Sequence, residues 1–222
     1  MSYPYPLVVF DLDGTLVDSA ADIAEALNRT LEDIGMARVP EATVLGWIGD
    51  GVRRLVEQAV HAAGREVDLA EVMPVFMAHY RECLLRSPRL FDGVAEALMQ
   101  LRAGGVPLAI CTNKPEALVP PLLQHLGIGD AFALVLGGDS LPQRKPSGEP
   151  LRHIAAHFGL AVDACLMVGD SLTDYRAAEE AGMPIALVRY GYPRGLDLAT
   201  AQAVAVIDDL RELPGLAAGV RV

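Results

Sequence analysis

The chain has 222 residues, of which 52% are hydrophobic and 21% are charged, and its formal net charge is −11. This composition supports a packed core and excludes wholesale disorder. The acidic balance argues against a nucleic-acid-binding protein, which needs clustered Lys and Arg. Any phosphate-bearing ligand must therefore meet a local positive charge, and a metal ion could supply it.

The beginning of the chain, MSYPYPLVVF, lacks the basic region and the apolar segment of a signal peptide. The sequence has no run of about 18 apolar residues that could cross a bilayer. The three cysteines, Cys83, Cys111 and Cys165, are widely spaced in apolar surroundings, which favours buried thiols in a reducing compartment. We therefore expect a cytoplasmic protein without a membrane partner.

Short apolar runs predict the strands of a sheet. They lie at residues 7–10, 108–111, 133–136, 165–168, 185–188 and 204–207. Continuous apolar runs, as opposed to alternating ones, are typical of strands that are buried on both faces. Helical patterns, for example at 94–103 and 151–158, separate the runs. Strands that alternate with helices predict an α/β fold in which three layers surround a parallel sheet.

About ninety residues without a convincing strand pattern separate the first apolar run from the second. Ser19 and Asp22 have the spacing of a capping box, and apolar residues then recur at helical spacing. We expect an all-helical insert, similar to a lid, over residues 19–86. The α/β core would consist of residues 1–18 and 87–222.

Two acidic residues directly follow the first apolar run, in the sequence Asp11-Leu12-Asp13-Gly14-Thr15. Ligands of open parallel sheets bind beyond the carboxyl ends of the strands. Residues two apart in an extended segment point the same way, and Gly14 permits a tight turn beside them. One carboxylate could act as nucleophile and the other as general acid and then base, and both could help to hold a hard cation. Taken alone, the motif also fits a solvated turn.

Asp170 follows another apolar run, and Asp174 comes four residues later, one turn along a helix. Two strands that deliver carboxylates to one edge of a sheet are typical of a Mg²⁺ site. A bound cation would relieve the repulsion between such close carboxylates. The structural alternative is that Asp170 and Asp174 only cap a helix.

Other polar residues at predicted strand ends suit a phosphate. Thr112 and Asn113 end the run at 108–111, where a hydroxyl, an amide and free backbone N–H groups would meet at a helix N-terminus. Lys145 lies in a loop before a proline, where a fixed cation could offset the aspartates and hold phosphoryl oxygens. Arg144 is the rival candidate for that cation. Each signal alone also fits a purely structural turn.

In chain order, the sequences DLDGT at 11–15 and TN at 112–113, then Lys145, then GDSLTD at 169–174 resemble the motifs of the haloacid dehalogenase-like superfamily. The resemblance spans nearly the whole chain and implies a Rossmann-like core with a helical cap. Within the superfamily the chain looks most similar to phosphoglycolate phosphatases. The stretches that carry this narrower resemblance are FDLDGTLVDS at 10–19, TNKP at 112–115, GGDSLPQRKP at 137–146 and YGY at 190–192.

The resemblance implies a role for each matching residue. Asp11 would be the nucleophile that forms an aspartyl-phosphate. Asp13 would protonate the leaving alcohol and then deprotonate the attacking water. Thr112 and Lys145 would hold the phosphoryl group. Mg²⁺ would be held by Asp11, Asp170 and the backbone carbonyl of Asp13.

Further residues are expected near this centre. Asp174 and Ser171 would support the metal ligands from behind, and Gly14, Thr15 and Asn113 would lie against the substrate. The loop Gly49-Asp50-Gly51 is expected to open a helix of the insert, so that its amides could meet a carboxylate of the substrate. Arg53, just beyond, could assist.

The expected partner is a small phosphorylated metabolite, first of all 2-phosphoglycolate. Another phosphatase of the same group, acting on a sugar phosphate or pyrophosphate, is the nearest alternative. A phosphosugar mutase would have to protect its aspartyl-phosphate from water, and a non-catalytic binding protein would be expected to lack one of the acidic residues or Lys145. The protein is expected to be a monomer or a homodimer.

Overall fold

Six strands form a parallel sheet in the order β5-β4-β1-β6-β7-β8. Their bounds in the computed structural model, which describes residues 3–216, are Val8–Phe10 (β1), Leu108–Cys111 (β4), Leu134–Leu136 (β5), Leu166–Gly169 (β6), Ile185–Val188 (β7) and Ala205–Ile207 (β8). Each strand lies within or overlaps a predicted apolar run. The prediction of a parallel-sheet α/β core with Rossmann-like architecture is therefore confirmed.

Strand β1 lies in the interior of the sheet, between β4 and β6, and Val8 is in register with Leu108 on one side and Leu166 on the other. Its residues are fully buried because helices cover both faces of the sheet. Val8 packs in the cluster on one face, and Val9 in the cluster on the opposite face. This two-sided burial explains why the run is continuously apolar.

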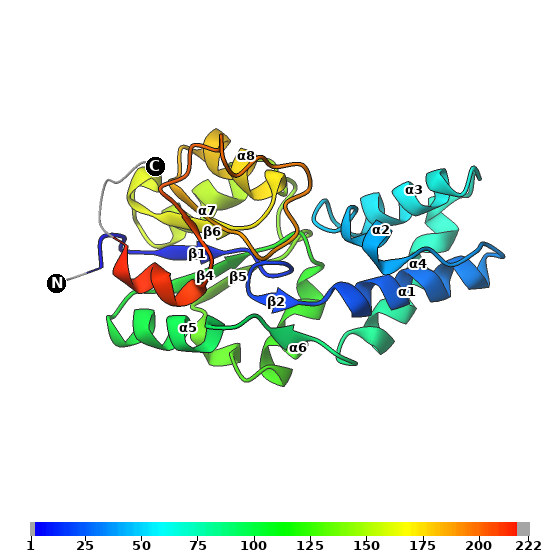
Figure 1. Ribbon diagram of the computed structural model, residues 1–222, viewed down its shortest axis with the longest axis horizontal. Coiled ribbons are helices and arrows are strands. Elements are labelled where there is room, and N and C mark those ends of the chain that lie inside the picture. Colours follow the sequence, from blue (N-terminus) through cyan, green and yellow to red (C-terminus); the bar gives the residue numbers. More distant parts are fainter. Residues whose placement is uncertain (1–2, 217–222) are drawn as a thin grey trace.

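Helices α5 (Val94–Ala103) and α6 (Val119–His125) cover one face of the sheet, and α7 (Glu149–His157) and α8 (Leu172–Ala181) cover the other (Figure 1). Short 3₁₀ helices complete the core: Glu116–Leu118 (η1), Gly129–Ala131 (η2), Val162–Ala164 (η3) and Leu210–Gly215 (η4). Prolines stand in the first turn of α6, a position that tolerates a missing N–H group.

Four helices follow β1 and lie beyond the carboxyl ends of the strands (Figure 1): α1 (Ala20–Asp33), α2 (Glu41–Leu45), α3 (Val52–Ala62) and α4 (Leu69–Cys83). We call them the helical insert. Two short strands, β2 (Val17–Asp18) and β3 (Arg89–Leu90), pair antiparallel where the chain enters and leaves it. These strands were not predicted, because two residues carry no periodic pattern. Dividing the chain at 19–86 stays our proposal.

The predicted capping box at Ser19 and Asp22 is wrong. Ser19 precedes α1 but its side chain makes no capping hydrogen bond; its hydroxyl donates to Asp13 Oδ1 at 2.6 Å instead. Asp22 accepts from the backbone N–H and the hydroxyl of Ser87, at 3.2 and 2.6 Å. Both side chains form hydrogen bonds with residues outside the first turn of α1, and the spacing of Ser19 and Asp22 cannot predict those bonds.

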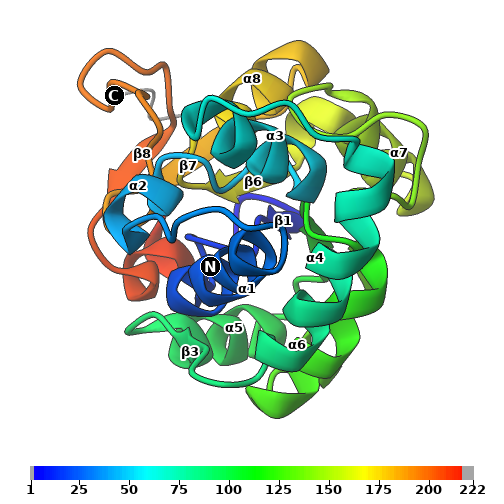
Figure 2. The ribbon, with the colours of Figure 1, turned by 90° about the vertical axis from the view of Figure 1, so that its right-hand side faces the viewer.

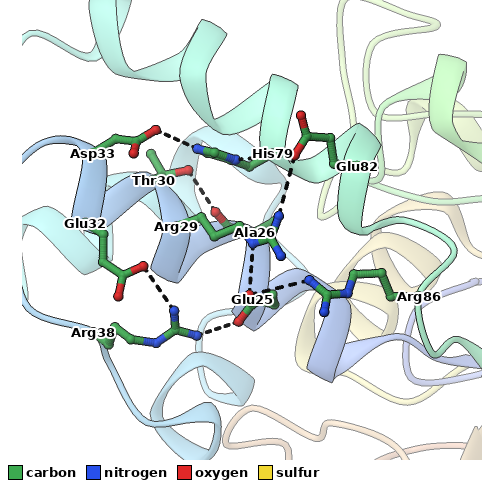
Figure 3. Close-up of polar contacts among 10 residues, drawn as sticks. All are labelled: Glu25, Ala26, Arg29, Thr30, Glu32, Asp33, Arg38, His79, Glu82 and Arg86. Atoms are coloured by element: carbon green, nitrogen blue, oxygen red, sulfur yellow. Dashed lines mark hydrogen bonds and ion pairs between the residues drawn. The ribbon is translucent and has the colours of Figure 1, made fainter.

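Helices α1 and α4 pack side by side and form the body of the helical insert (Figure 2). Their buried faces bring Leu27 and Leu31 into one apolar cluster with Phe76. Polar contacts join their exposed edges, among them Arg29 of α1 with Glu82 of α4 at 3.5 Å (Figure 3). Exposed pairs of this kind stabilise a protein by less than about 1 kcal/mol each, so apolar burial holds the insert together.

Two further expectations concern burial and membranes. Cys83, Cys111 and Cys165 are all buried and free, as predicted. Among residues 3–216, no helix is both long enough and apolar enough to span a bilayer.

Candidate active site

The order of the strands brings three polar strand ends together. From β1 the chain continues to β4 on one side, and later reaches β6 on the other side. Asp11, Thr112 and Asp170 each directly follow one of these three neighbouring strands. Such a point, where successive connections run to opposite sides, is where α/β sheets bind ligands.

Three buried carboxylates gather at this point. One oxygen each from Asp11, Asp170 and Asp174 lies within 4.8 Å of the other two. The Asp170 carboxylate is held by two donors, the Thr15 hydroxyl at 2.6 Å and the Tyr192 backbone N–H at 2.7 Å. Burial, and then the charge of Asp174, raises the pKa of Asp170 well above its usual value. Asp170 is therefore fixed in position, but burial and the neighbouring carboxylates disfavour its ionised form.

Lys145 is the cation that faces this cluster. Its buried Nζ lies 2.7 Å from Asp11 Oδ1 and 2.6 Å from Asp174 Oδ1. Burial alone would favour the neutral amine, but Asp11 and Asp174 outweigh it and raise the pKa of Lys145. Arg144, the rival candidate, is exposed. The structure thus places Lys145, and not Arg144, against the carboxylates.

The charge balance of the cluster fits a divalent cation. Three carboxylates and one ammonium leave −3 + 1 = −2 charges in a buried space when all are ionised. Burial and the charge of Asp174 raise the pKa of Asp11 to about 7, although Lys145 acts in the opposite direction. Oxygen ligands that repel one another in this way are the donors that Mg²⁺ binds.

Asp174 has less capacity for a metal than the other two carboxylates. Its Oδ2 accepts from the Ser171 hydroxyl at 2.7 Å and from the backbone N–H groups of Ser171 and Asp170, at 3.1 and 3.3 Å. Its Oδ1 accepts from Lys145. Ser171 and Asp174 also form the capping box of α8. These bonds suit Asp174 to orient Lys145 and the loop after β6.

The side chain of Asp13 does not belong to the three-carboxylate group. Its Oδ1 accepts from the Ser19 hydroxyl at 2.6 Å and from Lys114 Nζ at 2.9 Å. These partners are Ser19, at the entry to α1, and Lys114 of the core. That Asp13 helps to hold the cation, through its side chain or its backbone carbonyl, stays a prediction.

A small cavity of about 40 Å³ lies between the sheet and the helical insert. The core contributes Asp11, Asp13, Thr112, Asn113 and Lys114; the insert contributes Ile23, Ile48, Gly49, Gly51, Val52, Leu55 and Tyr80. The wall formed by the core therefore holds the polar and charged side chains, and the wall formed by the insert is mainly apolar. Thr112 lies at this wall, and its Oγ1 accepts from the backbone N–H of Lys114 at 3.1 Å.

The loop at residues 49–51 attaches the insert to the core. Asn113 Nδ2 donates to the carbonyls of Gly49 and Lys145, both at 2.8 Å. Asp50 accepts from the Thr173 hydroxyl at 2.8 Å and from Arg194 at 2.6 Å. As predicted, the loop precedes a helix of the insert, because α3 begins at Val52.

Arg53 lies away from this cavity. Its side chain is 61% exposed, and its Nε lies 3.1 Å from Glu57. It lines the same outer cavity as Arg144. Of the residues proposed at the substrate from the insert, the structure brings Gly49 and Gly51 to the small cavity and leaves Arg53 outside it.

The comparisons with known proteins agree with this geometry. The model of the family "Haloacid dehalogenase-like hydrolase" matches residues 8–188. The chain belongs to the haloacid dehalogenase-like hydrolases. It is therefore an enzyme of a hydrolase family, as the motifs predicted.

Individual relatives carry a narrower name. A phosphoglycolate phosphatase of Cupriavidus necator is 42% identical over 100% of this chain and 97% of its own. One of Colwellia psychrerythraea is 40% identical over 86% and 88%. The crystal structure of a predicted phosphoglycolate phosphatase from Haemophilus somnus has a TM-score of 0.88 and 36% identity, covering 95% and 96%.

No role was predicted for Tyr80 or for Lys114, although Lys114 lies in the TNKP stretch at 112–115. Lys114 Nζ lies 2.5 Å from the hydroxyl of Tyr80, which comes from α4 of the insert. One sequence signal could have found Lys114. The chain has 18 basic residues, but only Lys114 and Lys145 are lysines. Lysine occurs twice in the chain, once in each of two motif loops. This distribution differs from that of solvated surface lysines, which are usually numerous and scattered.

Gly14 holds the turn next to the metal-ligand candidates, and Gly14→Ala is expected to weaken Mg²⁺ binding. Its φ is +96°, and an added Cβ would lie 2.4 Å from Asp170 Oδ2. Displacing a ligand should lower metal affinity about 10–100-fold. Titration of thermal stability with Mg²⁺ measures this. The matched control is Gly35→Ala, where φ is +71° and no atom lies within 4 Å of the added Cβ. Equal Mg²⁺ affinity in the two variants would contradict the prediction.

Proposed function

We propose that this hydrolase is a Mg²⁺-dependent phosphatase of small phosphate monoesters, and that it converts 2-phosphoglycolate into glycolate and phosphate. The observation that carries the proposal is the position of Asp11, whose carboxylate lies 2.7 Å from the buried Lys145 ammonium and beside the small cavity. The names of the relatives support the choice of substrate. The buried thiols and the family also support a cytoplasmic enzyme. A monomer or a homodimer stays our expectation for its oligomeric state.

The proposed chemistry uses the two carboxylates in sequence. Asp11 attacks phosphorus, forming an acyl phosphate, and the P–O bond to the alcohol breaks. Asp13 gives its proton to the leaving oxygen, because an alkoxide leaves poorly. Asp13 then takes a proton from water as that water attacks the acyl phosphate, which releases phosphate and regenerates Asp11. After the second step, Asp11 is again a free carboxylate and Asp13 is again protonated.

The remaining residues stabilise charge during these steps. Lys145 faces the oxygens of Asp11 and would hold the phosphoryl group together with Thr112. Mg²⁺, held by Asp11, Asp170 and the backbone carbonyl of Asp13, would reduce the repulsion between the nucleophile and the phosphate. The apolar wall of the insert would keep bulk water out of the cavity.

Release of inorganic phosphate from a panel of esters tests the proposal. The panel contains 2-phosphoglycolate, glucose 6-phosphate and pyrophosphate, each with Mg²⁺ and after chelation with EDTA. We expect kcat/KM for 2-phosphoglycolate to exceed the others at least about tenfold. EDTA should reduce turnover to background, and added Mg²⁺ should restore it. Turnover that survives chelation would refute metal dependence, and a better sugar phosphate would refute the substrate.

A further inference from the structure

The second buried lysine has no role in the proposed chemistry. The Lys114 side chain is 0% exposed, and its Nζ lies 2.9 and 3.2 Å from the two oxygens of Asp13. The same Nζ lies 2.5 Å from the Tyr80 hydroxyl, and Lys114 is one of the residues that line the small cavity. Burying an ammonium costs free energy unless the charge is paired. Lys114 lies at the wall of the cavity where the proposed substrate would bind.

The surroundings of Lys114 are a buried ion pair. Its Nζ pairs with the Asp13 carboxylate and contacts the Tyr80 hydroxyl, and both of these residues also line the small cavity. Lys114 therefore brings an ammonium group to the boundary between the core and the insert. Lys145, in contrast, is engaged with Asp11 and Asp174. The two lysines thus pair with different carboxylates of the site.

The geometry restricts which part of the ligand Lys114 can meet. To protonate the ester oxygen, Asp13 must come within about 3 Å of it. Lys114 Nζ lies 2.9 Å from the same carboxylate. The ester oxygen and the ammonium are therefore at most about 6 Å apart. A carboxylate on the carbon that bears the ester oxygen has its own oxygens about 3 Å from that ester oxygen.

We propose that Lys114, with the hydroxyl of Tyr80, binds a carboxylate one carbon from the ester oxygen and so determines specificity for phosphate esters of 2-hydroxy acids. This proposal rests on the proposed phosphatase function and assigns its substrate class to a residue pair. Tyr80 comes from the insert and Lys114 from the core, so the carboxylate would bind both parts of the protein. The apolar side chains of Ile23 and Leu55 and the small cavity disfavour bulky, hydroxyl-rich alcohols.

The first test compares two substrates that differ in one group. Ethyl phosphate carries a methyl group where 2-phosphoglycolate carries its carboxylate. In Lys114→Met, the ratio of kcat/KM for 2-phosphoglycolate to that for ethyl phosphate should fall at least about 100-fold. Arg65→Met, which removes an exposed cation of the insert, should keep the wild-type ratio. If Lys114 only positions Asp13, both substrates lose activity equally and the unchanged ratio overturns the proposal.

The second test needs no catalysis. The chain has two lysines, so wild-type protein labelled with nitrogen-15 at the lysine side chains gives two ammonium signals in NMR spectra. Either single Lys→Met variant assigns them. Glycolate, which has the carboxylate but no phosphate, should shift the Lys114 signal, whereas inorganic phosphate should shift the Lys145 signal.

The outcomes separate this inference from the proposed function. If glycolate leaves the Lys114 signal unchanged while the enzyme still releases phosphate from its esters, the specificity proposal is overturned and the phosphatase function stands. If glycolate shifts Lys114 but no ester is hydrolysed, the carboxylate site stands and the proposed function fails.

Discussion

Asp11→Asn is expected to keep the fold and to lower kcat by at least about three orders of magnitude, because an amide is a poor nucleophile. The change alters no volume, and the carboxamide can still accept a hydrogen bond from Lys145, which lies 2.7 Å away. Circular dichroism checks the fold, and phosphate release with saturating substrate measures kcat. A variant that retains a tenth of wild-type turnover would show that Asp11 is not the nucleophile.

The same substitution is expected to stabilise the metal-free protein, by roughly 3 °C in Tm. The substitution removes the Asp11 carboxylate from a cluster of three buried carboxylates. Burial and the charge of Asp174 raise the pKa of Asp11 to about 7. A carboxyl whose pKa is raised on folding contributes its stabilisation at low pH and loses it as the pH rises towards 7. The gain in Tm should therefore be larger at pH 8 than at pH 5.

An exposed carboxylate provides the control for this pH dependence. Asp163→Asn changes the same charge at the surface, outside the cluster, and should leave Tm nearly constant at both pH values. Addition of Mg²⁺ should reverse the order of wild type and Asp11→Asn, because only the wild type has all the proposed ligands. If Mg²⁺ stabilises both proteins equally, Asp11 does not hold the ion.

Lys145→Met is expected to destabilise the metal-free protein by about 3 kcal/mol and to lower kcat/KM at least about 100-fold. Removal of Lys145 leaves Asp11 and Asp174 buried without their cation, which lies within 2.7 Å of both. Urea unfolding measures the free energy of unfolding, and phosphate release measures kcat/KM. Mg²⁺ should restore part of the stability, since it supplies a replacement charge.

Arg144→Met is the matched control, because it removes the neighbouring cation in the same loop. Arg144 is exposed, so its loss should change stability by less than about 0.5 kcal/mol. If Arg144→Met and Lys145→Met had equal effects on kcat/KM, the assignment of the phosphate-facing cation to Lys145 would fail.

Several features of this enzyme follow from local sequence patterns. The six core strands could be placed because strands covered on both faces must be continuously apolar, as β1 and β6 are. Asp11, Thr112 and Asp170 could be assigned to one edge because parallel strands end on the same side of a sheet. The helical pattern after Ser19 likewise predicted an insert made of helices.

Other features depend on which side chains meet in space. Ser19 and Asp22 have the spacing of a capping box, but Asp13 and Ser87 are their actual partners. The spacing of two aspartates could not show that the Asp13 carboxylate turns away to Lys114 and that Asp174 joins Asp11 and Asp170. Hydrogen bonds to distant residues decide both cases.

The sequence by itself therefore determined the fold class, the family and the edge of the sheet where the chemistry lies, because these depend on hydrophobic periodicity and short motifs. The tertiary structure alone decided how the charges pair: Lys145 with Asp11 and Asp174, and Lys114 with Asp13 and Tyr80. Pairing depends on distances of a few ångströms between residues that are far apart in the chain, and no local pattern encodes those distances.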